Sequence, residues 1–354
     1  MTQVKLYGRA NGFGSHAQVT RGFRQALEAK GMLAAFHAVD QTMDHEDRRY
    51  DNAPVAIYTG PIECLGTVSS AHARTFVMVA PNSSKIPNQM AKLLKDSGYE
   101  ILVPSQWAAG VVSGIGNPVH VVPHGVFSEQ ISWANRPRGD VLTKWWDGEM
   151  SFVHYSSSHG QRKGTLELAN AWVKLRAMDP SWSKLSLILV LDPLAEQRFI
   201  QDFDGPMDGM TVTTRLDGPY QMSGMDPCGF ANGMRCFNAV VQPSRGEAFG
   251  LIPLEARAAG VPTILTHSTG HTEHVPVEQS DRSSMVIVGV GDESPIDDCP
   301  MATAPKVTVD AIVKALRYAR NHWVELEKES EQQRKSVLQQ WSWENQLAPF
   351  LDSL

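Results

Sequence analysis

Short apolar runs alternate with amphipathic stretches along the first part of the chain. Residues Thr20–Lys30 carry apolar side chains at helical spacing and are followed by Gly31, a typical helix stop. The apolar runs around this segment predict buried strands at Val4–Tyr7, Pro54–Tyr58, Thr75–Val79, Tyr99–Val103 and Val119–Val122. Short buried strands separated by helices are typical of a parallel sheet that helices cover.

The same alternation starts again after an irregular stretch. Ile131–Met150 contains proline, glycines and two adjacent tryptophans without a clear period, and we interpret it as the connection between two domains. Beyond it, strands are predicted at Ser151–Tyr155, Leu185–Leu191, Thr211–Leu216, Ala239–Val241, Thr263–Thr266 and Met285–Val288. The predicted fold class is therefore α/β, with two doubly wound Rossmann-like domains at residues 1–147 and 148–335 that face each other across a cleft.

Helical patterns lie between the strands of the second series. Thr165–Met178 places its apolar side chains on one face, and Leu254–Ala259 follows a glycine-containing loop. Thr308 is a suitable N-cap for a further amphipathic helix. The highly charged Glu325–Lys335 predicts a solvated helix.

Composition and charge exclude several function classes. The chain has 354 residues, 42% hydrophobic and 20% charged, which is typical of a globular protein. Its net charge of −6 provides no general attraction for nucleic acid or an anionic membrane. No apolar run approaches the ~20 residues that span a bilayer, so we expect no membrane insertion. Four scattered cysteines and the absence of a signal pattern favour a cytoplasmic location.

The segment Gln242–Glu255 carries the strongest candidate chemistry. It follows a predicted strand and leads into a helix, where free backbone N–H groups suit an anion such as a diphosphate. Gly246 and Gly250 allow the backbone to approach a ligand closely. Glu247 and Glu255 can accept hydrogen bonds from ribose or sugar hydroxyls. From spacing alone, two solvated surface acids are an equally good interpretation.

Two other loops follow predicted strands. In Tyr155–Gly164, Arg162 and Lys163 can neutralise phosphate charge, whereas a purely structural basic turn would be disfavoured by the helix dipole. In Tyr7–His16, Gly12 and Gly14 form only a fragment of a dinucleotide fingerprint. We favour this loop as the floor of a cleft over an NAD site.

Metal-binding patterns are weak. Asp202 and Asp204 have a D-x-D spacing, but they lie among glycine and proline residues that are typical of a surface loop. His267, His271 and His274 have a loose ligand spacing, and a polar contact from His271 or Thr272 to a sugar is the stronger interpretation. We therefore predict no metal site.

The residues Glu247–Glu255 (EAFGLIPLE) resemble the E-x7-E element of retaining glycosyltransferases of family 4, which have the GT-B fold. The likeness extends to flanking segments and to elements elsewhere in the chain: Pro243-Ser244, Ala256–Thr263 (ARAAGVPT), Val103–Trp107, Val121–Val126, Lys163-Gly164 and Trp341–Glu344. It covers the chain well from about Val103 onward, and before that it rests mostly on topology. It also implies that residues 336–354 form a C-terminal helix that returns to the first domain.

The resemblance implies a nucleotide-sugar donor held mainly by the second domain. By position, Glu255 would bind the ribose, Glu247 the donor sugar and Lys163 the diphosphate. The backbone around these acids and the loop of the first domain would complete the donor site, through Gly246, Ala248, Phe249, Gly250, Leu251, Gly14 and Ser15. The family usually has a second basic residue where this chain has Ser158, and Arg162 is the candidate replacement.

The implied reaction is transfer of a hexose, from a UDP-sugar by preference, to a hydroxyl acceptor with retention of configuration. No metal or other cofactor is expected, because Lys163, Arg162 and helix N-termini would stabilise the departing diphosphate. Glu247, Lys163 and His124 are the candidate catalytic residues. The first domain would bind the acceptor, which is a sugar, a small molecule or a modified DNA base, through His16, Asn82, Ser83 and Lys85.

Two alternatives stay open at this stage. One is a non-catalytic protein that binds a nucleotide-sugar. The other is an NAD-dependent oxidoreductase that uses the Gly12/Gly14 loop.

Overall fold

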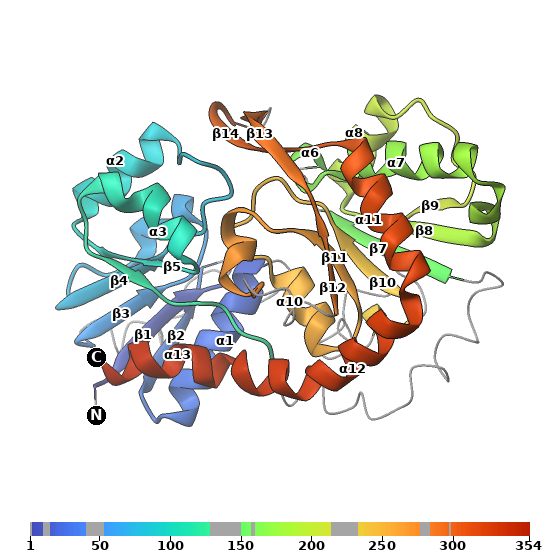
Figure 1. The fold of residues 1–354 in the computed structure, drawn as a ribbon. Helices are drawn as coiled ribbons and strands as arrows, with labels where there is room; N and C mark the ends of the chain where they lie inside the picture. The colour runs from blue at the N-terminus through green and yellow to red at the C-terminus, as the bar shows by residue number, and fades with distance from the viewer. Residues whose placement is uncertain are drawn as a thin grey trace.

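The computed structural model describes residues 2–9, 15–39, 53–127, 150–156, 160–213, 233–276, 284–296 and 299–354. These residues form two α/β units, each with a six-stranded parallel sheet, and a separate two-stranded hairpin (Figure 1). The predicted fold class, with two doubly wound domains, is confirmed. The predicted boundary between residues 147 and 148 and most of the predicted connection Ile131–Met150 lie outside the described residues.

The first domain has the strand order β2-β1-β3-β4-β5-β6, with every neighbouring pair parallel. Its strands are β1 (Val4–Gly8), β2 (Leu33–Ala38), β3 (Val55–Tyr58), β4 (Arg74–Met78), β5 (Glu100–Val103) and β6 (Val119–Val121). Its α-helices are α1 (Ser15–Ala29), α2 (Asn88–Ser97) and α3 (Gln106–Val112). Five of the six strands were predicted. The exception is β2 (LAAFHA), whose alanines have low β-propensity.

The second domain has the order β12-β11-β10-β7-β8-β9. Its strands are β7 (Met150–Ser156), β8 (Leu185–Leu191), β9 (Met210–Thr213), β10 (Ala239–Gln242), β11 (Thr263–Thr266) and β12 (Met285–Val288). Its α-helices are α6 (Gly160–Lys163), α7 (Thr165–Met178), α8 (Pro193–Asp202), α10 (Leu251–Ala258), α11 (Val309–Asn321) and α12 (Trp323–Gln340). All six strands were predicted within a few residues, although positions 214–216 of the third prediction lie outside the described residues.

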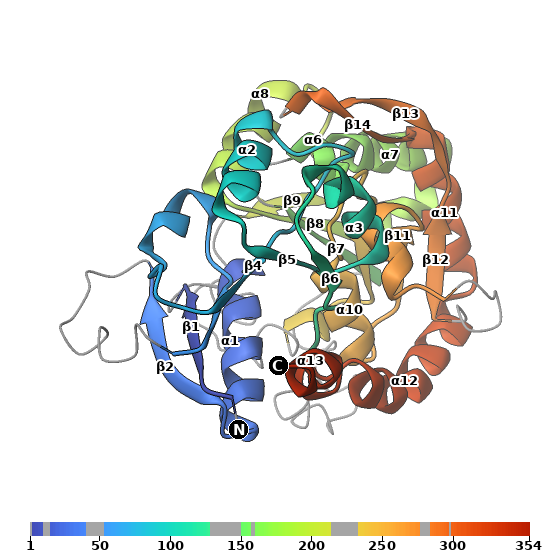
Figure 2. The ribbon, with the colours of Figure 1, turned by 90° about the vertical axis from the view of Figure 1, so that its left-hand side faces the viewer.

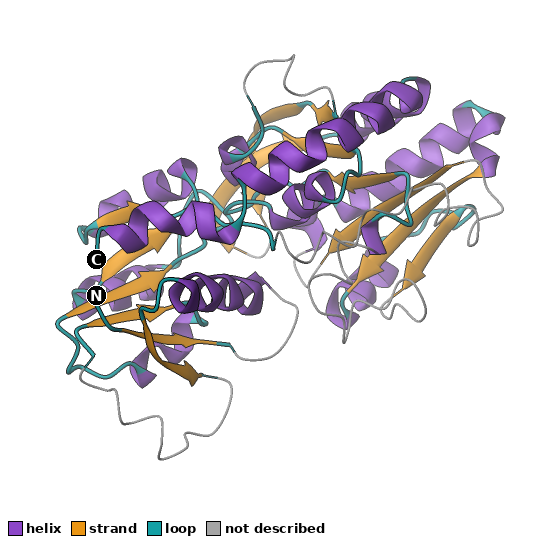
Figure 3. Ribbon diagram, turned by 90° about the horizontal axis from the view of Figure 1, so that it is seen from below, coloured by secondary structure: helices purple, strands orange, loops and turns teal. Residues whose placement is uncertain are grey.

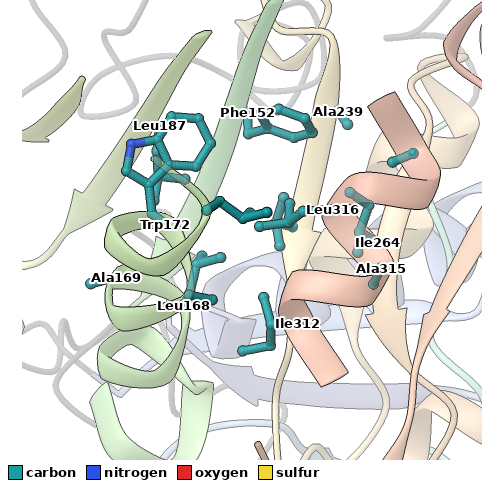
Figure 4. Packing of buried hydrophobic residues seen from close by; sticks show 14 of the residues in the cluster. Phe152, Leu168, Ala169, Trp172, Leu187, Ala239, Ile264, Ile312, Ala315 and Leu316 are labelled. Carbon is teal, nitrogen blue, oxygen red and sulfur yellow. The ribbon is translucent and has the colours of Figure 1, made fainter. Parts of the chain in front are cut away.

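Helices α7 and α11 cover one face of the second sheet (Figure 4). Leu168 and Trp172 of α7 pack against Phe152 of β7, and Leu316 reaches the same cluster from α11. The spacing of Leu168, Trp172 and Leu175 places all three on the buried stripe of the helix, as predicted. Thr308 caps α11 by accepting a hydrogen bond from the N–H of Ala311.

The last helix, α13 (Trp343–Asp352), leaves the second domain and packs on α1 of the first (Figures 2 and 3). Trp343 is fully buried, and an added Cβ at Gly22 would lie 2.2 Å from its ring. The N–H of Val126 donates to the carbonyl of Trp341 at 2.7 Å, and the N–H of Trp343 donates to the carbonyl of Val126 at 3.2 Å. The two termini therefore lie side by side, joined by a hydrogen bond from the Thr2 hydroxyl to the Leu354 carbonyl at 3.1 Å.

A hairpin that the sequence pattern did not predict connects the domains at a second place. Strands β13 (Val290–Ile296) and β14 (Cys299–Val307) pair antiparallel, and three prolines obscure their periodicity. The buried Arg245 donates to four carbonyls of the hairpin, at Ser294, Pro295, Ala304 and Pro305. At the other side, Thr303 donates its N–H to the Ser84 hydroxyl of the first domain at 2.9 Å.

Among the described residues, no helix has both the length and the apolar character needed to cross a membrane.

Replacing Trp343 by alanine tests the role of α13 in holding the first domain. We expect a loss of about 3–5 kcal/mol, because a fully buried indole leaves a cavity against α1. Thermal unfolding monitors the effect, and Val324→Ala is the control because Val324 is 72% exposed. Equal melting temperatures for the two variants would show that Trp343 does not hold α13 against the first domain.

Candidate active site

The strand order of the second sheet reverses between β7 and β10, which lie side by side but are far apart in sequence. In doubly wound sheets, the crossovers from two such strands go to opposite faces, and this leaves a crevice beyond their carboxyl ends. Lys163 follows β7, and Glu247 follows β10. The topology therefore brings together two residues that are 84 positions apart.

A cleft of about 460 Å³ opens at this position between the two domains. From the second domain it is lined by Arg162, Lys163, Glu247 and Glu255, by the backbone segment between the two acids, and by the ends of β7 and β8. From the first domain it is lined by Ser15, His16, Gln18, Ala80, Asn82 and His124. The paired acids and the lysine thus share one cavity with the first domain.

Glu247, Lys163 and Arg162 form a buried ionic cluster. Lys163 Nζ forms an ion pair with Glu247 Oε1, and Arg162 Nη1 lies 3.5 Å from Glu247 Oε2. Burial alone would raise the pKa of Glu247, but the charges of Lys163 and Arg162 outweigh it and hold this pKa well below its ordinary value. Glu247 is therefore ionised at neutral pH, and its oxygens can accept hydrogen bonds.

Glu255 lies in an environment of the opposite kind. Burial raises the pKa of Glu255 to about 8, although a hydrogen bond from Gln18 and the charge of Arg21 oppose the shift. Its Oε2 atom is buried and has no hydrogen-bond partner. An orphaned buried acceptor is costly unless a ligand supplies donors, and two ribose hydroxyls are donors of that kind.

Three glycines of this region fit the close packing around the cleft. Gly164 has φ 71°, and an added Cβ would lie 2.4 Å from the Pro243 carbonyl oxygen, so the loops after β7 and β10 are in contact. An added Cβ at Gly246 would lie 2.1 Å from the Asn82 carbonyl oxygen of the first domain. Gly250 has φ 93° at the N-cap of α10, which directs the helix N-terminus and its N–H groups toward the cleft.

Two histidines of the first domain face the cleft as neutral groups. Burial, and to a smaller extent His16, lowers the pKa of His124 to about 3. Its Nδ1 atom is buried without a partner, and its ring lies 5.2 Å from the ring of Phe249. Burial also lowers the pKa of His16, which is bound through Nδ1 to the Thr59 carbonyl at 3.2 Å. Both rings can exchange hydrogen bonds with sugar hydroxyls.

The remaining predicted site residues are placed less centrally. Ser83 and Lys85 do not line the cleft, and Ser83 Oγ donates to the Lys85 carbonyl at 2.9 Å within a local turn. The side chain of Phe249 packs against His124, His274 and Trp341, which leaves only its backbone for a ligand. Gly14 and Ser158 lie outside the described residues.

Two polar residues at or beside the site were not predicted from the sequence. Gln18 hydrogen-bonds Glu255 from the buried face of α1, and a long polar side chain on a mostly apolar helix face was the available signal. Arg245 connects the loop between β10 and α10 to the hairpin, and its only signal was its position next to Gly246.

The histidines considered for a metal have structural partners. His271 Nδ1 lies 2.9 Å from the Thr266 carbonyl oxygen, and His274 Nε2 lies 3.0 Å from the Phe249 carbonyl oxygen. The loop that carries them packs directly behind the Glu247–Gly250 segment. Among the residues that the structure describes, no group of three His, Cys, Asp or Glu side chains could hold a metal ion.

One protein family matches the C-terminal part of the chain. Residues 224–350 match the family described as "Family 4 Glycosyltransferase in conflict systems". This segment of the chain matches glycosyltransferase family 4. The matched segment contains the Glu247–Glu255 element, and the predicted family membership is confirmed. The family match and the shared fold together support a glycosyltransferase that takes its sugar from a nucleotide-sugar donor.

Solved structures share the whole two-domain architecture, which is the GT-B fold. Sucrose-phosphate synthase from Thermosynechococcus elongatus is 15% identical with a TM-score of 0.61, and the match covers 100% of this chain and 98% of that one. A glycosyltransferase from Rickettsia africae is 14% identical with a TM-score of 0.64, and the match covers 99% of this chain and 97% of that one. Anabaena HepE, in complex with UDP and glucose, is 12% identical with a TM-score of 0.63, over 100% of both chains. No match was found among curated proteins.

Glu255→Gln tests whether this carboxyl is held at a cost in stability. Because its pKa is raised to about 8 in the folded state, the folded protein loses stability as pH rises from about 4.5 to about 8, and the loss is complete above that range. The uncharged glutamine escapes this loss. We therefore expect a melting temperature several degrees above that of the wild type at pH 8.5, and a difference that shrinks toward pH 5.

The exposed Glu325→Gln is the control, and it should not change the melting temperature at either pH. A Glu255→Gln variant that is less stable than the wild type at pH 8.5 would contradict the assigned environment.

Proposed function

We propose that the protein transfers a hexose from a UDP-sugar to a hydroxyl acceptor with retention of anomeric configuration and without a metal. The observation that carries the proposal is the shared cleft, in which Glu247, Glu255 and Lys163 face His16, Asn82 and His124 of the first domain. The UDP and glucose bound to HepE, a protein with the same fold, support UDP as the first nucleotide to test.

Each end of the donor would meet a group of suitable charge. The ribose hydroxyls would donate to Glu255, whose Oε2 atom lacks a partner. The hydroxyls of the sugar would donate to Glu247, whose carboxylate stays ionised beside Lys163. The diphosphate would lie between Lys163, Arg162 and the N-terminus of α10, where two cations and a helix dipole attract negative charge.

The same cations would stabilise the leaving group. Cleaving the bond between the anomeric carbon and the phosphate oxygen leaves negative charge on the diphosphate, next to Lys163 and Arg162. The acceptor oxygen would attack the face that the phosphate leaves, and its proton would move to a departing phosphate oxygen. His124 and His16 would orient the two sugars rather than remove the proton, because burial keeps the pKa of each ring low.

Proton release on UDP binding tests the role of Glu255. Ribose hydroxyls that donate to the carboxylate would lower its pKa from about 8, so binding at pH 7 should release close to one proton. Calorimetry in two buffers with different ionisation enthalpies measures this release. Glu255→Gln should abolish it and weaken UDP by roughly 10- to 100-fold, since hydrogen bonds to a charged acceptor are lost.

Unchanged UDP affinity and proton release in Glu255→Gln, measured on a folded variant, would exclude this carboxyl from the donor site. If the wild type binds another nucleoside diphosphate but not UDP, the donor carries a base other than uracil.

Transfer or slow hydrolysis of UDP-[13C]glucose, followed by NMR of the first-formed product, tests the reaction itself. We expect the α-configuration of the donor to be kept, and a loss of at least 100-fold in kcat for Lys163→Ala, because stabilisation of the departing charge is removed. The acceptor panel should include free sugars, small-molecule alcohols and DNA with hydroxymethylated bases. A β-configured product would contradict retention, and binding without turnover across the panel would favour a non-catalytic binder.

A further inference from the structure

Thr269 has an unusual backbone conformation close to the loop between β10 and α10. In the part of the chain that the structure describes, it is the only non-glycine residue with a positive φ, at 51°. A β-branched side chain is strained in this region of conformational space. Such strain persists only where the surroundings enforce it, and it is concentrated at functional sites.

The strained turn holds the backbone of Glu247 at both of its polar groups. The N–H of Glu247 donates to Thr269 Oγ1 at 3.1 Å, and the carbonyl of Glu247 accepts from the N–H of Gly270 at 2.8 Å. Thr269 itself is 7% exposed and does not line the cleft. Two consecutive residues of the turn thus fix the segment from which the Glu247 carboxylate projects.

The surrounding contacts leave the turn little freedom to move. An added Cβ at Gly270 would lie 2.2 Å from the carbonyl carbon and oxygen of Ala248, so the two backbones are in direct contact. The Thr272 hydroxyl donates to the Thr269 carbonyl at 2.7 Å, which closes the turn on itself. The turn is also bound to the end of β11, because His271 Nδ1 donates to the Thr266 carbonyl at 2.9 Å.

We infer that Thr269 is a positioning residue for the transferred sugar, and that its hydroxyl sets the place of the Glu247 carboxylate. The inference rests on the proposed contact of Glu247 with the donor sugar. The Lys163 ion pair fixes the carboxylate from the cleft side, and the Thr269 hydrogen bond fixes its backbone from behind. Thr269 therefore affects the sugar half of the donor and leaves the nucleotide half, at Glu255, unaffected.

Comparing the affinities for UDP and for UDP-glucose distinguishes an effect on the sugar half of the donor from an effect on the nucleotide half. Thr269→Val keeps the shape and the β-branch but removes the hydroxyl, so we expect UDP-glucose affinity and kcat for its hydrolysis or transfer to fall about 3- to 10-fold. UDP affinity should stay within twofold of the wild type. Thr269→Ser keeps the hydroxyl and should behave like the wild type in both measurements. Equal losses of UDP and UDP-glucose affinity would indicate a merely structural role and overturn the inference.

Hydrogen–deuterium exchange of the peptide spanning residues 244–252 tests the inference without any ligand. We expect faster exchange in Thr269→Val, since the N–H of Glu247 loses its acceptor, and wild-type exchange in Thr269→Ser. Unchanged exchange in Thr269→Val would overturn the positioning role even if no UDP-sugar binds. Failure of the wild type to bind any nucleotide-sugar, with the expected exchange pattern, would count against the proposed function alone.

Discussion

The site depends on the ion pair between Lys163 and Glu247, which joins the loops after β7 and β10 where the strand order of the second sheet reverses. A buried pair of this kind contributes little net stability, because the two charges lose more hydration than their attraction returns in many proteins. The role of the pair in this site is to set the charge of the cleft. Together with Arg162, the cluster carries two positive charges and one negative charge, which leaves one net positive charge facing the cleft. A diphosphate would complete that balance.

The two glutamates of the Glu247–Glu255 motif have pKa values that are shifted in opposite directions. Glu247 is kept ionised by adjacent cations, whereas Glu255 is desolvated and readily takes up a proton. Groups whose environments push their pKa values apart are typical of functional sites. The difference follows from location, since Glu247 lies in the loop beside Lys163 and Glu255 lies one turn into α10, against α1 of the first domain. The first domain therefore shapes the environment of Glu255 directly, through Gln18 and Arg21.

Most of the sheet architecture could be predicted because buried parallel strands are short, apolar and flanked by helices. The pattern failed at β2, where alanines give no strand signal, and at the β13–β14 hairpin, where prolines hide the alternation. In the candidate site, the sequence indicated the Glu247–Glu255 motif and Lys163, because each directly follows or lies close behind a predicted strand. Three residues could not be predicted in this way. Thr269 and Arg245 act through backbone contacts with distant segments, and Gln18 comes from the other domain. Local sequence spacing does not indicate contacts of either kind.

A crystal structure with an intact or non-hydrolysable UDP-sugar bound would show directly whether Glu255, Glu247 and Lys163 hold the donor. We expect the ribose hydroxyls within hydrogen-bond distance of the Glu255 carboxylate, the hexose against Glu247, and the diphosphate between Lys163 and the N-terminus of α10. A donor bound elsewhere on the molecule, with the Lys163–Glu247 pair facing only solvent, would contradict this expectation.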